Sequence, residues 1–167
     1  TCQGTRAGDA ADALYVETLP TAMMIDEAVS AYNNRNYADA QRLYRTALAM
    51  PAGEQKRVIN GLYLTSWRLG QRDAAQDAFE KIVTRGLFER QLGVRFLFQP
   101  ASTEFVNDRD LRAQYAIWSR VLAQRIDDTQ DCVAVVGHAS KTGDPAFNEV
   151  LSLRRAQAVA RSLSQQN

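Results

Sequence analysis

The sequence is poor in the residues that most often carry chemistry. It has one histidine and two cysteines in 167 residues, so a metal site built from several such side chains is not expected. Twenty Lys and Arg residues against nineteen Asp and Glu give a formal charge of +1, which favours neither nucleic acid nor an anionic membrane surface. No glycine-rich phosphate loop occurs. We therefore expect no cofactor, no metal and no nucleic acid, and a partner that is recognised locally.

Long apolar runs are also lacking. No run approaches the roughly 20 residues needed to span a bilayer. No charged segment followed by an apolar one stands at the N-terminus, so we expect a mature soluble segment. A hydrolase is not expected either, because His138 and Ser140 have no nearby acidic residue to orient the histidine as a base. We predict a non-enzymatic protein with no catalytic residue, in which His138 is a structural residue at a strand end.

The two cysteines leave three alternatives open. Cys2 and Cys132 could form a disulfide in an oxidising periplasm. Cys132 could instead be a small buried hydrophobic residue that opens a strand. Cys2, followed by a polar stretch, suggests a lipoprotein with an acylated end, although Thr1 is not the small residue usual before such a cysteine. A lipid anchor on Cys2 would then be the only membrane attachment.

The length and the 46% hydrophobic content allow one sizeable core or two small ones, and two small ones fit the pattern better. Residues 1–20 hold two glycines and a proline with little apolar periodicity, so we expect an extended lead-in. From residue 21 to residue 86 the chain contains an internal repeat. Ala40, Tyr44 and Ala47 recur 35 positions later as Ala75, Phe79 and Ile82.

A period near 34 resembles the tetratricopeptide (TPR) repeat, a helical hairpin with small residues where its helices cross. Small Ala40 and Ala75 would let antiparallel helices approach closely. Pro51 ends the first unit and Gly70 supplies the turn of the second. The resemblance implies a protein partner bound by the TPR-like helices. Two repeats are few for a solenoid, so we expect either the C-terminal domain or a flanking helix from the first twenty-odd residues to cap them.

The helical periodicity stops between Gly86 and Gly93, where we place a domain boundary. Residues 94–98 then predict a strand, with Val94, Phe96 and Phe98 alternating onto one face. An amphipathic stripe from Leu111 to Ile126 predicts a helix that Asp108 or Asp110 could cap.

Two further elements are expected in the part of the chain that follows the domain boundary. The valine-rich run Cys132–His138 predicts a buried strand. Asp144-Pro145 pairs a capping residue with the residue favoured at a first helical position, so a helix is expected from 145–148 to about Leu163.

The run from Val133 to Ser140, with Asn148, Leu151-Ser152 and Arg155-Ala156, resembles the C-terminal OmpA-like domain of bacterial envelope proteins. That domain has β-α-β-α-β-β order, and its last two strands are absent here, through truncation or because the protein is a shortened descendant. The expected fold class is α+β: all-α TPR-like hairpins over 21–86, followed by an incomplete OmpA-like β-α-β-α domain over 94–167.

The resemblance implies a binding site for the diaminopimelate of the peptidoglycan stem peptide. In the family an arginine pairs with the ligand carboxylate and an aspartate with its ammonium. Arg155 matches the arginine, but Ser140, fifteen positions earlier, stands in place of the aspartate. Asn148 matches a family asparagine that fixes the loop or touches ligand, and Asp144 is a possible substitute carboxylate.

Two functions remain open. The first is a periplasmic protein, either free or an outer-membrane-associated lipoprotein, that anchors to peptidoglycan while its TPR-like helices hold a protein partner. The second is a degenerate OmpA-like domain that no longer binds peptidoglycan and serves as a docking or scaffold component of an envelope or secretion complex. Ser140 and the absent strands favour the second, whereas Asn148 and Arg155 favour the first.

Overall fold

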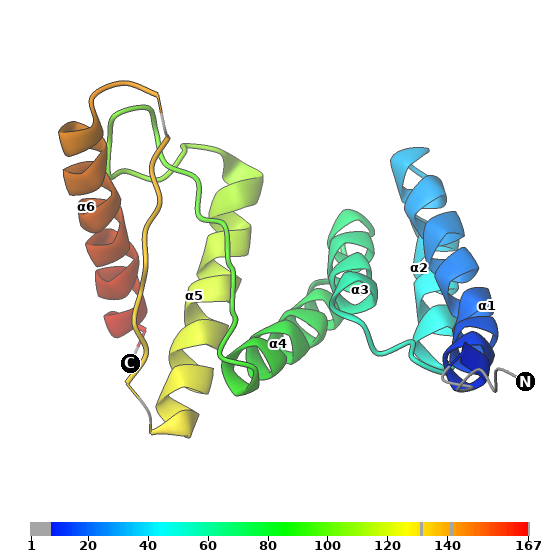
Figure 1. The fold of residues 1–167 in the computed structure, drawn as a ribbon. Coiled ribbons are helices and arrows are strands. Elements are labelled where there is room, and N and C mark those ends of the chain that lie inside the picture. Colours follow the sequence, from blue (N-terminus) through cyan, green and yellow to red (C-terminus); the bar gives the residue numbers. More distant parts are fainter. Residues whose placement is uncertain (1–7, 131, 141, 167) are drawn as a thin grey trace, which may run out of the picture. The chain divides into compact units, whose positions relative to one another are not determined.

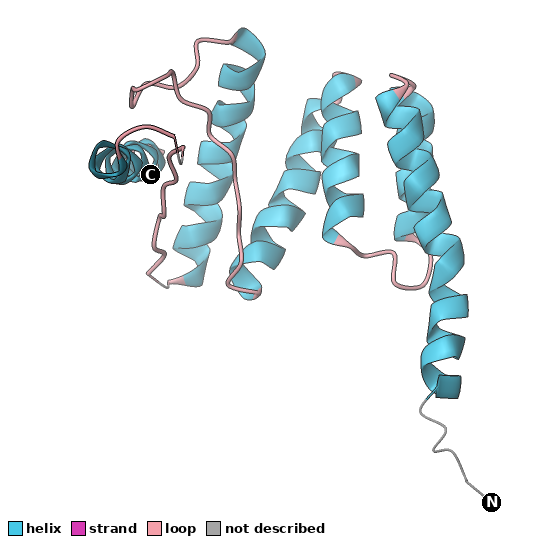
Figure 2. Ribbon diagram, turned by 45° about the horizontal axis from the view of Figure 1, so that its top comes forward, coloured by secondary structure: helices cyan, strands magenta, loops and turns pink. Residues whose placement is uncertain are grey.

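The computed structural model describes residues 8–130, 132–140 and 142–166. Within them the chain forms six α-helices and no sheet (Figures 1 and 2). They are α1 (Gly8–Asn33), α2 (Tyr37–Leu48), α3 (Lys56–Arg68), α4 (Arg72–Phe88), α5 (Arg109–Thr129) and α6 (Pro145–Ser164). The chain divides into two compact units, Thr1–Ile82 and Val83–Asn167. No helix in the described part has both the length and the apolar character needed to cross a membrane.

The predicted α+β fold, with an OmpA-like β-α-β-α domain over residues 94–167, is wrong. Segments 94–98 and 132–138 run extended, but the described residues contain only one isolated antiparallel bridge, between Phe98 and Phe105. A strand is stable only when neighbouring strands pair with its backbone and its apolar face is covered. The chain supplies the strand-forming residues without the pairing, so both segments remain irregular.

The two helices predicted for this half are confirmed. Asp108 caps α5, its side chain accepting a hydrogen bond of 2.8 Å from the backbone N–H of Leu111. Asp144 caps α6 in the same way, accepting a bond of 2.8 Å from the N–H of Phe147, and Pro145 opens the helix. Local capping chemistry is therefore enough to fix where both helices begin.

The extended lead-in predicted over residues 1–20 is wrong from Gly8 onward, because α1 starts there and continues through Pro20. Residues 1–7 lie outside the described part. Ile25 and Ala28, further along the same helix, are fully buried in the core of unit 1. Tertiary packing of this kind stabilises helices whose local signal is weak.

In unit 1 the repeat found in the sequence recurs in the hydrogen bonds of the turns. Arg35, after α1, has φ 62°, and Gly70, after α3, has φ 73°. The turn bonds are Arg35 N–H to Tyr32 O (2.9 Å) and Asn36 N–H to Ala31 O (2.9 Å) in the first hairpin, and Gly70 N–H to Trp67 O (3.1 Å) and Gln71 N–H to Ser66 O (2.9 Å) in the second. Every donor and acceptor is displaced by 35 positions. The two hairpins thus share one turn geometry.

The repeated side chains form the core of unit 1. Ala40 and Ala75 are fully buried, and the rings of Tyr44 and Phe79 are nearly so. A Cβ atom at Gly61, on α3, would lie 2.3 Å from the Tyr44 ring, so glycine is required for this close packing. The aromatic side chains fill the space that the small residues leave.

The Gln41 side chain is buried between the hairpins. The Gln41 amide donates to Ser66 Oγ (2.9 Å) and to Gln71 Oε1 (2.8 Å), which ties α2 to the second turn. Its burial is therefore compensated by hydrogen bonds.

Unit 2 is held by an aromatic cluster. Its members are Phe96, Phe98, Phe105, Tyr115 and Trp118, whose contacting rings have centroids 5.0 to 5.8 Å apart. The Tyr115 hydroxyl also accepts a bond of 2.9 Å from the N–H of Leu97. Residues 94, 96 and 98 are half-buried while 95 and 97 are exposed, so the predicted alternation is present without a sheet.

Candidate functional site

Three of the residues predicted to bind peptidoglycan meet in the loop before α6. Ser140 Oγ lies 2.7 Å from Thr142 Oγ1, and the N–H of Thr142 donates to Ser140 Oγ over 3.2 Å. The Asn148 amide donates to the carbonyl oxygen of Thr142 (2.8 Å), and Asp144 caps the helix beside it. Each of these groups has a role in shaping the loop.

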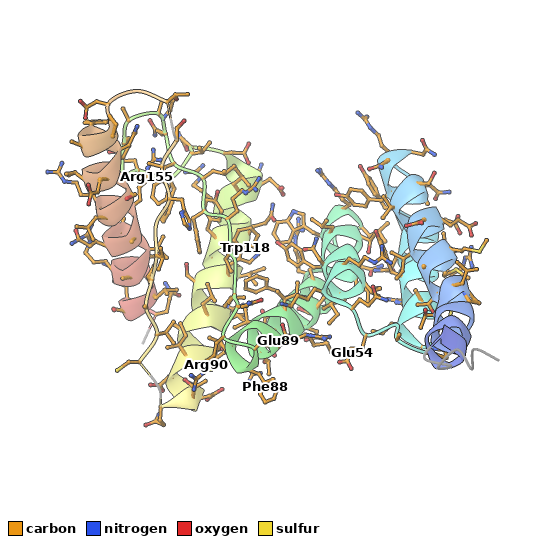
Figure 3. The ribbon with its side chains drawn as sticks, in the orientation of Figure 1. Glu54, Phe88, Glu89, Arg90, Trp118 and Arg155 are labelled. Atoms are coloured by element: carbon orange, nitrogen blue, oxygen red, sulfur yellow. The ribbon has the colours of Figure 1, made fainter. Side chains whose placement is uncertain are left out.

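Arg155 is engaged elsewhere in unit 2. Its Nε donates to the carbonyl oxygen of Ser102 (2.9 Å) and its Nη2 to that of Gln99 (3.0 Å). The guanidinium carbon also lies 5.0 Å from the centre of the Phe98 ring. Figure 3 shows this half-buried side chain on α6, beside the loop that precedes α5. Arg155 therefore fastens α6 to the turn formed by residues 99–102.

Within the described part of the chain, Arg155 bonds to none of the other residues predicted to bind peptidoglycan. Arg155 follows Asn148 by seven positions, two helical turns or roughly 10 Å along the axis. Ser140 supplies no charge, and one oxygen of Asp144 already accepts the capping bond. Backbone carbonyls already accept from Nε and Nη2 of Arg155, so a ligand carboxylate would have to use the remaining N–H donors of the guanidinium.

The other candidates from the sequence are solvent-facing. Cys132 is exposed and unbonded, so its prediction as a buried strand residue is wrong. Cys2 lies outside the described residues, so the predicted Cys2–Cys132 disulfide also lies outside them. His138 is exposed at the end of its segment. No group of three metal-ligating side chains occurs in the described part of the chain.

Sequence patterns did not point to an open groove of about 540 Å³ in unit 2. Its lining includes Gln99, Glu104, Phe105, Arg112, Tyr115 and Ser162. None of the four predicted site residues lines it. The turn at 99–105 brings these side chains together, and no periodic signal in the sequence marks that turn.

In unit 1, α1 and α3 form one shared face. The carboxylate of Asp26 lies 3.9 Å from the guanidinium of Arg57, joining the first helices of the two hairpins. Met23, one turn before Asp26, is 64% exposed. An exposed, adaptable apolar side chain beside a solvated ion pair is suited to contact a protein partner. The sequence pattern missed Met23 because it lies off the core stripe of α1.

No protein-family model, curated protein or solved structure matches this chain. The TPR-like and OmpA-like resemblances are therefore predictions that rest on the sequence motifs alone.

Proposed function

We propose that this chain is a non-enzymatic protein-interaction module of the bacterial cell envelope, whose paired helical hairpins bind a protein partner. The repeated turn bonds support a scaffold in which α1 and α3 present a common face. The envelope setting rests on the motif resemblance of residues 133–156.

The face formed by Met23, Asp26 and Arg57 carries this proposal, because it combines an exposed apolar side chain with two solvated charges. Interfaces of transient complexes commonly have such an apolar centre and polar rim. Arg45, on α2, is exposed and outside this face, which makes it a matched control.

Site-specific photo-crosslinking in cells tests the proposal. A photoreactive amino acid at position 23 is expected to give one discrete protein adduct, and the same group at position 45 is expected to give none. Met23→Glu combined with Arg57→Glu should abolish the complex when the partner is purified with the wild-type chain. Identical crosslinking from positions 23 and 45 would count against this face.

A second candidate function is anchoring to the peptidoglycan stem peptide. The observation in its favour is that Ser140 and Asn148 are joined through Thr142, and that Asn148 lies on the helix that carries Arg155. Against it stands the loss of the carboxylate at position 140. A charged hydrogen bond contributes about 1.5–3 kcal/mol and a neutral one about 0.5–1.5, so the lost carboxylate corresponds to roughly tenfold weaker binding.

Titration with a diaminopimelate-containing muropeptide, followed by amide NMR shifts, distinguishes the two functions. Wall anchoring predicts shifts at residues 137–155 that Arg155→Ala removes and Arg154→Ala, its exposed neighbour, leaves intact. Ser140→Asp should then tighten binding. Absence of shifts at millimolar ligand in both the wild type and Ser140→Asp would exclude the anchor.

A further inference from the structure

An unpaired extended segment lies between α5 and α6. Residues 132–139, here called the open edge, connect the two helices without forming a sheet (Figure 1). None of their backbone N–H or C=O groups bonds to any residue that the structure describes. Val133, Val135 and Val136 are all substantially exposed. The segment thus presents a free row of backbone donors and acceptors together with β-branched side chains.

One face of the open edge packs on α6. A Cβ atom at Gly137 would lie 2.2 Å from the carbonyl oxygen of Ser152, so this glycine approaches the helix backbone directly. Side chains alternate along an extended segment, which turns Val133 and Val135 toward the same side. Val136, 72% exposed, points the other way. The contact at Gly137 leaves the segment's lateral hydrogen-bonding edges unoccupied.

The open edge lacks the usual protection against pairing. Exposed edge strands are commonly guarded by charged residues, proline or a bulge. No residue from Cys132 to Ser140 is charged or proline. An uncharged extended run with unsatisfied backbone groups is a template for another strand.

We propose that two copies of this chain associate by antiparallel pairing of their open edges. A partner strand that is extended, uncharged and rich in β-branched residues suits such an edge, and the open edge itself has all three properties. Pairing centred on Val135 places Val133 of one copy opposite Gly137 of the other. Val135 then faces Val135 of the second copy across a two-fold axis, the commonest symmetry of protein dimers. No charge opposes a like charge in this arrangement.

Sedimentation equilibrium of the full chain under reducing conditions tests the pairing without interference from cysteine disulfides. The wild type is expected to dimerise as its concentration rises. Val135→Lys and Val135→Glu, each alone, place like charges opposite each other and should raise the dimer dissociation constant about tenfold or more. An equimolar mixture of the two variants should recover the dimer, because only residues that face their own copy give this charge-swap rescue.

Phe88→Lys, at a position that is 89% exposed and lies outside both the open edge and the Met23 face, is the matched control and should dimerise like the wild type. Hydrogen exchange of the amides of residues 133–137 gives a measurement that needs no substitution, and it should slow as the concentration increases. A wild type that stays monomeric to about 1 mM overturns the proposal. So does a dimer that persists in both charged variants, or exchange that is independent of concentration.

Discussion

The two units differ in how far the backbone groups outside their helices are hydrogen-bonded. In unit 1 each hairpin turn closes on its own preceding helix, through bonds that repeat at positions 35 and 70. In unit 2 the segment 132–139 bonds to nothing described, and 94–98 reaches only a single bridge. A helix completes its backbone hydrogen bonds within one segment, whereas a strand needs a partner that can be distant in sequence. The difference shows that strand-forming residues alone do not make a sheet.

The largest expected change in the free energy of unfolding comes from a comparison of a buried and an exposed aromatic side chain on α4. Phe79 is 4% exposed and Phe88 is 89% exposed. Phe79→Ala should lower the free energy of unfolding by about 3–5 kcal/mol, because it removes a core ring and leaves a cavity. Phe88→Ala should change it by less than about 0.5 kcal/mol. Urea denaturation of both variants measures the contrast, and equal losses would show that the repeat core is misplaced.

A smaller effect is expected where unit 2 relies on one side chain for a long-range contact. Arg155→Ala removes two hydrogen bonds to the turn at 99–102 and should cost about 1–3 kcal/mol. Arg154→Ala, at the exposed neighbouring position, should have a free energy of unfolding within about 0.5 kcal/mol of the wild type. Thermal unfolding measures the stability of both variants. If the two substitutions behave alike, Arg155 does not fasten the turn.

The matched turns of unit 1 allow a reciprocal exchange. Arg35 adopts the left-handed conformation that suits glycine, and Gly70 already occupies the equivalent position. Arg35→Gly should therefore stabilise by up to about 1 kcal/mol, and Gly70→Ala should destabilise by about 1 kcal/mol. If chemical denaturation shows that both substitutions change the free energy of unfolding in the same direction, the two turns are not equivalent.

The smallest effect concerns alkaline pH. Burial raises the pKa of the Tyr44 phenol, with Tyr32 adding to the rise and Arg57 opposing it. The unfolded phenol ionises near the ordinary value of about 10, so the folded state binds this proton more tightly. The resulting stability is complete below about pH 10 and is lost as the pH rises through the folded pKa. Over that range the wild type should lose stability relative to Tyr44→Phe, and a difference in stability that stays constant would argue against the shift.

Much of the helical structure could be predicted from the sequence. Asp108 and Asp144 mark helix starts by chemistry within three residues, and the 35-residue recurrence of Ala40 and Tyr44 marks the buried face. The helical part of the lead-in was predicted only as one of two alternative caps for the repeats, because α1 depends on packing at Ile25 and Ala28 rather than on local periodicity. The strands were predicted wrongly for a complementary reason: the residues at 132–138 favour an extended backbone but do not reveal whether another strand is present.

The candidate site was predicted only in part. Sequence order correctly placed Ser140 and Asn148 near one loop, because both flank the start of one helix. It could not show that Arg155 bonds to Gln99 and Ser102, more than fifty positions earlier, since no spacing pattern connects them. Motif identity therefore located the arginine without revealing what its guanidinium touches.

The recurrence of the turn bonds has a consequence for how this chain can grow. The bonds at Asn36 and Gln71 are equivalent, so residues 37–71 form a unit that ends in the same backbone geometry in which it starts. A tandem copy of these 35 residues would meet a matching junction at each end and need no new linker. The scaffold is thus modular: its length can change by whole units while the sequence of each junction stays the same.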